Sequence, residues 1–365
     1  MAESSAEAER FRAHFPVLQR VAYLNAGTEG PVPQAAVDAV AERMGADSAQ
    51  GRCGAGYRDA VLDMANRLRA GYAGVLGCEP SDVALTGSTT DGVNTVIGGL
   101  SWSPGDEILT SDEEHPGLLA PLGLARKRYG VAVRVVPFAE IAAAVSERTR
   151  LIACSHVSWV NGQVLDTEAI RRTGVSLLLD GAQGIGAVPV DVAELGCDFY
   201  AGSGQKWLCG PEGSGCLYVR RERLDDLDIP WPGYGSLADA LKALELLPAD
   251  GAARFDHSFP VGVRSAHALA ALAVFEQAGW SWVHQRASML ADLLAQRLTD
   301  RGLTVLPRGT STLVSFEVAD DKDTVTRLAA ESVVVRNIPT HQVVRASVGA
   351  WSSEEDIDRL VSLVS

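Results

Sequence analysis

Two charged residues in apolar or glycine-rich surroundings are the strongest candidates for chemistry in this chain. Asp180 ends the apolar run "VSLLLD", and Lys206 lies in the glycine-rich turn "SGQKWLCG" beside a tryptophan. Both positions are unfavourable for a charge, and charges in such positions are frequent at functional sites. A lysine amine that has lost its proton forms imines with carbonyl compounds. The pair therefore favours carbonyl chemistry.

Pyridoxal 5′-phosphate (PLP) is a cofactor that needs both of these residue types. It forms an imine with a lysine, and an acid must keep its ring nitrogen protonated so that the ring can accept electrons. Asp180 provides such an acid. It is followed by Ala182, which is small enough to lie flat beneath a ring, and by Gln183, a neutral hydrogen-bond donor.

The phosphate of such a cofactor also needs a binding site. The segment "GSTTDGVN" places Ser88, Thr89 and Thr90 at the start of a predicted helix, where hydroxyls, free amides and the helix dipole favour an anion. Ser203, just before the lysine, adds another hydroxyl. Each feature alone is ordinary, since such residues often only cap a helix. Their order along one alternating pattern favours a common site.

That pattern is a regular alternation of strands and helices between residues 80 and 220. It favours a parallel sheet with crossover helices, and strands that are apolar throughout indicate two covered faces. The predicted strands are "DVALTG", "DEILTS", "VAVRVVPF", "RLIACSHV" and "VSLLLD", and the predicted helices are "TTDGVNTVIGGL", "HPGLLAPLGLARKRYG", "IAAAVSERT" and "DTEAIRRTG". Ligands gather beyond the carboxyl ends of such strands. The segments that follow strand ends should therefore converge: 86–90, 111–115, 155–162, 180–183 and 203–206.

The pattern changes after residue 230. A helical stretch "LADALKALELL" precedes two long helices and the short strands "TVLP", "STLVSFEV", "VVVRNI" and "VVRASV". Ser352 or Ser353, followed by acidic residues, predicts the start of a final helix. We predict an N-terminal segment (1–20), a large domain (21–250) and a smaller C-terminal α+β domain (251–365).

Composition excludes several classes of function. The chain has 365 residues, 47% hydrophobic and 21% charged, with a formal net charge of −14, which disfavours binding to nucleic acid. No segment approaches the ~18 apolar residues of a membrane span, and the acidic N-terminal segment leads us to expect no signal peptide. The six cysteines are scattered without metal-ligand spacing, so we expect no metal site. We expect a cytoplasmic protein.

The stretch "LDGAQGIGAVPVDVAELGCDFYAGSGQKWLCGPEGSGCLYV" closely resembles the PLP-binding segment of class V aminotransferase-fold enzymes. This family includes cysteine desulfurases, cyst(e)ine C–S lyases and isopenicillin N epimerase-like proteins. The resemblance extends from "YLNAGTEGPVP" to "VRASVGAWSSEEDIDRL". It implies an α/β PLP-transferase fold of the aspartate aminotransferase type (fold type I), with a large, mostly parallel sheet domain and a small C-terminal domain. It also implies a homodimer with a shared active site.

The resemblance also assigns roles to individual residues. It implies PLP on Lys206, Asp180 at the pyridine nitrogen, Gln183 near the ring oxygen and His115 stacked over the ring. Thr89, Thr90 and Ser203 match phosphate contacts. Gln205 replaces the histidine that many members have before the lysine. The segment "DHSFP" (256–260) matches the one that reaches the neighbouring subunit's phosphate, and Ser258 is its only hydroxyl.

The substrate side is identified in the same way. The planar guanidinium of Arg345 can bind a carboxylate bidentately, and this residue aligns with the substrate-binding arginine of the family. Arg336 is a second candidate cation. Asn25, Gly27 and Thr28 match the segment that lines the substrate side, and Trp159 is a candidate for the side-chain pocket.

One departure from the desulfurase pattern bears on the reaction. Desulfurases carry a sulfur-accepting cysteine on a loop before the substrate arginine, whereas "VVVRNIPTHQVVRASVG" is short and no cysteine follows Cys216. We therefore expect a C–S lyase that acts on a cysteine-type amino acid by β-elimination, giving pyruvate, ammonia and a sulfur species. The alternatives are a class V aminotransferase or epimerase, a desulfurase-like protein without a persulfide cysteine, and a non-catalytic PLP-binding module.

Overall fold

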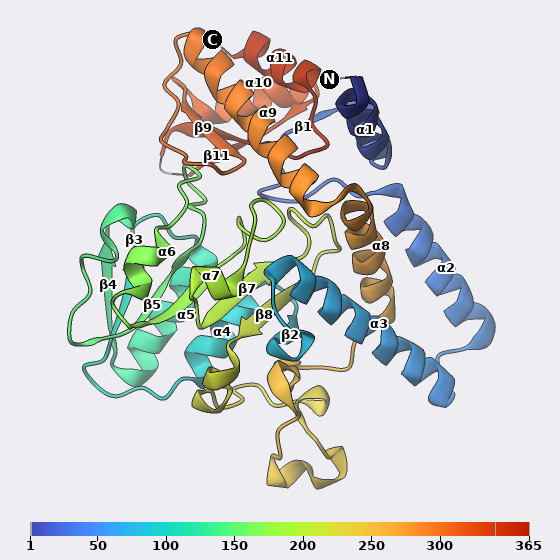
Figure 1. Ribbon diagram of the computed structural model, residues 1–365, viewed down its shortest axis with the longest axis vertical. Helices are drawn as coiled ribbons and strands as arrows, with labels where there is room; N and C mark the ends of the chain where they lie inside the picture. Colours follow the sequence, from blue (N-terminus) through green and yellow to red (C-terminus); the bar gives the residue numbers. More distant parts are fainter. Residues whose placement is uncertain (1, 340, 365) are drawn as a thin grey trace.

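A seven-stranded sheet forms the centre of the computed structural model, which describes residues 2–339 and 341–364 (Figure 1). The strand order is β2-β8-β7-β6-β5-β3-β4. Because only β8 runs antiparallel to its neighbours, the other strands all end at one edge. The strands are β2 (Val83–Thr86), β3 (Glu107–Ser111), β4 (Ala132–Val136), β5 (Thr149–Ser155), β6 (Ser176–Asp180), β7 (Phe199–Ser203) and β8 (Gly215–Val219).

Helices cover both faces of this sheet. Along β6, Leu177 and Leu179 pack into one hydrophobic cluster and Leu178 packs into another, as the alternation of side chains along a strand requires. The first cluster is covered by α3 (Gly54–Leu76), α6 (Thr167–Arg171), α7 (Val192–Leu195) and α8 (Gly262–Ala278), and the second by α4 (Thr89–Gly99) and α5 (Pro116–Tyr129). The predicted parallel sheet with two covered faces is confirmed.

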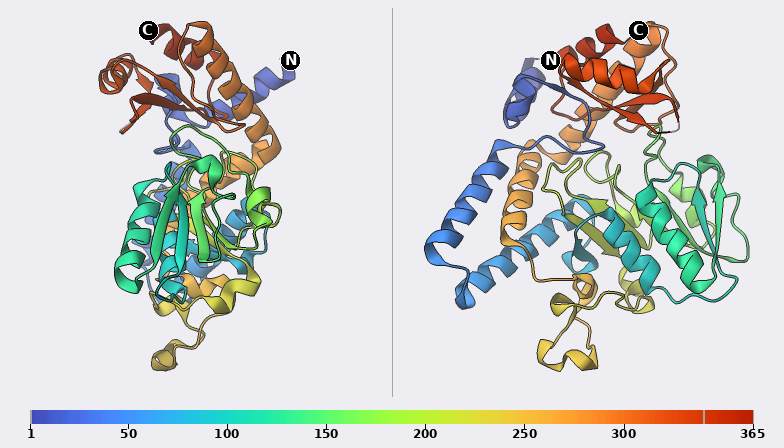
Figure 2. Two further views of the ribbon diagram at one scale, coloured as in Figure 1. Left: turned by 90° about the vertical axis from the view of Figure 1, so that its left-hand side faces the viewer. Right: turned by 180° about the vertical axis from the view of Figure 1, so that it is seen from behind.

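A second, smaller sheet lies at one end of the molecule (Figure 2). Its antiparallel strands have the order β11-β12-β9, and a two-stranded parallel pair joins β1 to β10. The elements here are β1 (Ala22–Tyr23), β9 (Leu313–Glu317), β10 (Val333–Val334), β11 (Arg336–Ile338), β12 (Val343–Ser347), α9 (Trp280–Asp300), α10 (Asp321–Ala330) and α11 (Glu354–Leu363). As predicted, Ser353 caps the last helix, in a capping box with Asp356.

The remaining elements connect the two sheets or lie beside them. They are α1 (Ala2–Ala13), α2 (Gln34–Gln50) and the 3₁₀ helices Pro16–Gln19, Pro80–Asp82, Phe138–Glu140, Arg221–Asp226, Tyr234–Ser236, Ala240–Glu245 and Gly251–Phe255. Helix α8 packs against α2 and α3 beside the large sheet, whereas α9 packs on the small sheet. The division of domains at residue 250 therefore stays a prediction.

Two predicted helices are wrong. Residues 141–148 form turns between a short 3₁₀ helix and β5, because the Thr149 and Ser146 hydroxyls accept hydrogen bonds from nearby amides and compete with a helix. The predicted helix 237–247 lies in an irregular arm, residues 237–249, which contains the 3₁₀ helix Ala240–Glu245 and projects from the body (Figure 1). Leu241, Leu244, Leu246 and Leu247 are exposed, and helical stability in proteins comes mostly from the packing of an apolar face. In "TVLP" only Val305 makes a strand-like bridge.

Candidate active site

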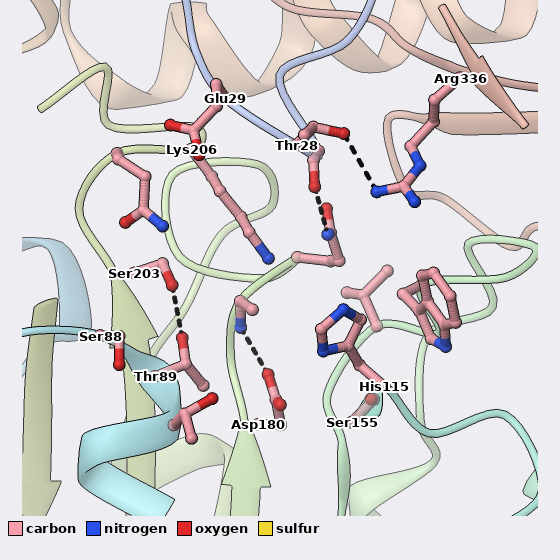
Figure 3. Close-up of a pocket in the computed structure, with 17 residues that line it drawn as sticks. Thr28, Glu29, Ser88, Thr89, His115, Ser155, Asp180, Ser203, Lys206 and Arg336 are labelled. Atoms are coloured by element: carbon pink, nitrogen blue, oxygen red, sulfur yellow. Dashed lines mark hydrogen bonds between the residues drawn. The ribbon is translucent and has the colours of Figure 1, made fainter. Parts of the chain in front are cut away.

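An open pocket of about 230 Å³ lies at the edge where the parallel strands end. Figure 3 shows the Lys206 side chain reaching its centre, with Thr89 and Ser203 on one side and His115 on the other. Most of the residues that the sequence singles out therefore meet here. The lining residues are Gly27, Thr28, Glu29, Ser88, Thr89, Thr90, His115, Ser155, Val157, Trp159, Asp180, Ala182, Gln183, Ser203, Gln205, Lys206 and Arg336.

Lys206 and Asp180 come from neighbouring strands, since β6 ends at Asp180 and Lys206 follows the end of β7. Burial, followed by the positive charges of Arg345 and Arg336, lowers the pKa of Lys206 to about 8, although Asp180 opposes this shift. A much larger fraction of the amine is therefore neutral, and nucleophilic, near neutral pH.

Asp180 forms the floor of this end of the pocket. The Ala182 amide donates to its Oδ1 at 2.9 Å, which fixes the carboxyl group. Burial raises the pKa of Asp180, whereas the Lys206 charge lowers it. A buried carboxyl group of this kind is suited to pair with a cationic ring nitrogen, because the opposite charge would offset its desolvation.

The first turn of α4 forms a second wall of the pocket. Ser88 caps the helix by accepting from the Asp91 amide, and the Thr89 and Ser203 hydroxyls are hydrogen-bonded to each other at 2.6 Å. The amides of a first turn have no acceptor within the helix. Gln205 also lines the pocket here, and its side-chain amide nitrogen is a further donor. Donors and a helix N-terminus at one place suit a phosphate group.

The opposite wall carries two arginines on the small sheet. Arg345 is fully buried and is not among the residues that line the pocket, whereas its register partner Arg336 lines it. Nη1 of Arg345 donates to the Trp159 carbonyl at 2.5 Å, but Nε and Nη2 have no hydrogen-bond partner within residues 2–339 and 341–364. Burial and then the charge of Arg336 lower the pKa of Arg345 to about 9. Unpaired guanidinium donors suit an anionic ligand.

Trp159 and His115 shape the space between these walls. Their rings meet edge to face with centroids 4.9 Å apart, and the Arg336 guanidinium lies 5.7 Å from the Trp159 ring centroid. His115 caps α5, because its Nδ1 accepts from the Gly117 amide at 3.0 Å. Partial burial and then the charges of Lys206, Arg336 and Arg345 lower the pKa of His115 to about 4. The imidazole is therefore neutral at physiological pH, with its proton on Nε2.

The N-terminal turn "NAGTEG" closes the pocket from above. Thr28 accepts from Arg336 at 3.2 Å and donates to Asn25 at 2.9 Å, so this turn orients the pocket arginine. Asn25 does not line the pocket itself. A Cβ on Gly27 would lie 2.6 Å from Nη2 of Arg345, so only glycine fits there.

Gln183 links this turn to the lysine turn. Its Nε2 donates to the Gly27 carbonyl at 2.8 Å, and its Oε1 accepts from the Trp207 indole at 3.0 Å. The amide nitrogen keeps one N–H for a ligand, so the predicted contact to a ring oxygen is compatible with these bonds.

Ser258 lies outside this pocket. It lines a separate pocket of about 220 Å³ together with His257, Phe259 and Arg264. It is not among the residues that line the lysine pocket, and its predicted contact to the phosphate of a second subunit stays a prediction.

The sequence did not reveal that Glu29 and Val157 line the pocket. It also did not single out the buried Glu114. Glu29 and Val157 belong to segments that the sequence placed near the site, but no chemical feature of these segments distinguishes them. Glu114 had one usable cue, since it directly precedes His115.

Comparisons with known proteins agree with this geometry. The family model described as "Aminotransferase class-V" matches residues 22–360. A cysteine desulfurase of Klebsiella pneumoniae (strain 342) is 30% identical over 400 residues, which cover 97% of this chain and 96% of the relative.

Solved structures of a cystine C–S lyase, C-DES, are also similar. Its complex with the reaction product cysteine persulfide superposes with a TM-score of 0.89 at 28% identity, covering 95% of this chain and 98% of that chain. A mutant of the same lyase, with glycine covalently linked to the PLP cofactor, gives a TM-score of 0.90 at 28% identity, covering 96% and 98%.

Proposed function

The chain belongs to the class V aminotransferase family, and from this premise we propose that it is a PLP-dependent C–S lyase. The family and the type I fold predicted from the sequence are confirmed. The proposed reaction is β-elimination from a cysteine-type amino acid, which releases a sulfur species, pyruvate and ammonia. The relatives support this choice, because they include cysteine desulfurases and a cystine C–S lyase.

The pocket residues fit PLP. We propose that Lys206 binds its aldehyde carbon, that Asp180 pairs with its ring nitrogen, and that Ala182 and His115 lie on the two sides of its ring. Its phosphate would bind at the start of α4, where the free helix amides and the Gln205 amide nitrogen can donate to it. The phosphate-binding residues proposed here are Ser88, Thr89, Thr90, Ser203 and Gln205, with Ser258 contributed to the neighbouring subunit.

The substrate would bind on the side of the arginines. We propose that Arg345, assisted by Arg336, binds the α-carboxylate through the donors that are otherwise unpaired. Asn25, Gly27 and Thr28 orient these cations, and Trp159 lines the space for the side chain. Two bonds from one guanidinium fix the orientation of the carboxylate and thereby place the Cα–H bond next to Lys206.

The protein's own groups then move protons. The low pKa of Lys206 lets its free amine accept the Cα proton as a general base at physiological pH. PLP, when bound, supplies an electron sink that stabilises the negative charge developing at Cα. The Cα–H and Cβ–S bonds break, a Cα–Cβ double bond forms, and the sulfur leaves with the electron pair. Hydrolysis of the unsaturated amine gives pyruvate and ammonia.

The observation that carries elimination over desulfuration is the hairpin before Arg345. Only residues 339–342 connect β11 to β12, and no cysteine follows Cys216 in the sequence. This hairpin leaves no loop long enough to bring a sulfur-accepting thiol to the pocket. A reaction that releases its sulfur with the leaving group needs no such acceptor.

Assays on the purified protein with cysteine, cystine, cysteine sulfoxides and cysteine S-conjugates test the proposal. Pyruvate and ammonia in equal amounts support the lyase. Alanine with persulfide would mean desulfuration, keto acid formed only with an amino acceptor would mean transamination, and inversion at Cα would mean epimerisation. A protein that binds PLP but converts none of these would be a non-catalytic PLP-binding module.

We also propose a homodimer with a shared active site. The arm at residues 237–249 is the surface that we expect to contact the second copy, because its Leu241 and Leu244 are 98% and 100% exposed. Side chains of this kind are costly to leave in water. The described helices include none that is long and apolar enough to cross a membrane. The cytoplasmic location stays a prediction.

A further inference from the structure

Glu114 is a buried carboxyl group that the proposed mechanism does not use. It follows β3 in the turn that leads to α5, and it is 5% exposed. Oε1 accepts from the Ser111 hydroxyl at 2.5 Å, Oε2 accepts from the Ser155 hydroxyl at 2.6 Å, and the Ser155 amide donates to both oxygens at 3.0 Å. These partners are all donors, so the environment is built for an ionised carboxylate.

Ser155 connects this carboxylate to the floor of the pocket. Ser155 and Asp180 are register partners in the parallel pair β5–β6, so their side chains lie on the same face at neighbouring strand ends. Ser155 also lines the pocket (Figure 3). Since its hydroxyl proton is donated to Glu114, Ser155 presents only lone pairs to a ligand. Glu114, Ser155 and Asp180 thus form a row at the ends of three adjacent strands, β3, β5 and β6.

The charges around Glu114 do not neutralise it. The titratable groups near it are Asp180 on β6, the Cys154 thiol on β5, and Glu113 and His115 next to it in the chain. No ion pair to Glu114 occurs in the described part of the chain. Burial raises the pKa of Glu114 to about 7, opposed by the hydrogen bonds from Ser111 and Ser155, and the Asp180 charge adds to the rise. Its charge therefore changes within the physiological pH range.

We propose that Glu114 is a positioning residue that sets the charge and hydrogen-bond polarity of the pocket floor, and so controls how tightly a cationic ring nitrogen is bound there. As a carboxylate it adds a second negative charge behind Asp180 and holds Ser155 as an acceptor. When Glu114 is protonated it loses this charge. The coupled pair of Glu114 and Asp180 then carries less negative charge at the pocket floor. This inference rests on the proposed PLP site.

The sign of the pH dependence follows. Below about pH 7 Glu114 is mostly protonated, and the floor attracts a cation less strongly. As the pH rises, the Glu114 proton leaves to solvent and the affinity for a ligand with a cationic ring increases. An interaction of one pKa unit corresponds to a tenfold change in affinity.

The test measures the dissociation constant of PLP between pH 6 and 8 by the absorbance of the bound cofactor. Lys206→Ala serves as the background, because it removes the titration of the lysine and every turnover. We expect PLP to bind about tenfold more tightly at pH 8 than at pH 6, after correction for the titration of its phosphate. Adding Glu114→Gln should remove most of this difference and leave the affinity near its low-pH value.

Two further variants make the test specific. Glu113→Gln is the matched control, since Glu113 is the adjacent carboxyl and is held by Ser158 and Asn161 instead; it should keep the pH dependence. Ser155→Ala keeps the Glu114 carboxyl group but removes a hydrogen bond that stabilises its ionised form. The midpoint of the pH dependence of PLP affinity should therefore move to higher pH. This variant decides the question if Glu114→Gln does not fold.

The outcomes separate the two proposals. Equal pH dependence in Glu114→Gln and Glu113→Gln, or an unmoved midpoint in Ser155→Ala, would overturn the role of Glu114 while the PLP site stands. A wild-type protein that binds no PLP would overturn the proposed function and this inference together.

Discussion

Arg345 lies directly opposite Arg336 in the antiparallel pair β11–β12, and two of its donor nitrogens have no partner in the described residues. Like charges at facing positions destabilise a sheet. A guanidinium that is buried without a carboxylate also costs free energy. The facing arginines therefore lower the stability of the ligand-free protein, and an anionic ligand bound to them would offset this cost.

Replacing Arg345 should consequently separate stability from function. We expect Arg345→Met to raise the free energy of unfolding of the cofactor-free protein by about 1–4 kcal/mol, because an apolar side chain needs no partner. The same change should lower kcat/KM on the true substrate by about thirtyfold to five-thousandfold, since one charge-assisted pair is worth about 2–5 kcal/mol. Urea unfolding and steady-state kinetics measure the two effects.

Arg297→Met provides the control for this experiment. Arg297 is paired with Glu354 and Asp358 at the surface, so its loss should change stability little and kinetics not at all. If Arg345→Met kept the wild-type kcat/KM, Arg345 would not be the carboxylate site.

Lys206→Ala should abolish turnover but not folding. The loss of a general base alone costs about 10²–10⁴-fold in rate, and the loss of the covalent attachment adds to this. Borohydride reduction followed by peptide mass analysis should find the pyridoxyl group on Lys206 of the wild type. Lys322→Ala, at an exposed helical site, should behave like the wild type. A label on any other lysine would contradict the assignment.

The rate of covalent PLP capture by the apoprotein should follow the neutral fraction of Lys206. Because the pKa of Lys206 is lowered to about 8, the rate should rise tenfold per pH unit below pH 8 and level off above it. With the ordinary lysine pKa of about 10.4 it would continue to rise to pH 10. Stopped-flow absorbance measures this profile.

Charge variants should move this profile in opposite directions. Arg336→Gln removes a cation that disfavours the ammonium form, so the plateau should begin at higher pH. Asp180→Asn removes an anion that favours it, so the plateau should begin at lower pH. Identical profiles in both variants would show that these charges do not control the lysine.

Charged residues on the exposed arm should disrupt self-association. We expect the double variant Leu241→Asp and Leu244→Asp to elute as a monomer with the mass of one chain, because a buried contact cannot accept two unpaired carboxylates. Met289→Asp replaces another exposed apolar residue away from the arm and should keep the wild-type mass. Light scattering coupled to gel filtration measures both, and an unchanged dimer would place the interface elsewhere.

The sequence by itself determined the features that depend on neighbouring residues. An apolar run that ends in an acid predicted β6 and Asp180, and Ser353 followed by acidic residues predicted the cap of α11. The parallel sheet followed from the alternation of strand and helix patterns, because crossover connections place the strand ends at one edge. This rule predicted that Thr89, His115 and Lys206 meet at one site, and all three line one pocket in the structure.

Only the tertiary structure decided which side chains lack partners. Arg336 and Arg345 face each other because of the register of a hairpin, and Glu114 meets Ser155 only because β3 and β5 pair. The arm at residues 237–249 shows the reverse case, in which a helical pattern gives no α-helix. The burial of a side chain, the pairing of its charge and the stability of a helix all depend on contacts between residues far apart in sequence. The local spacing of residues does not determine these contacts.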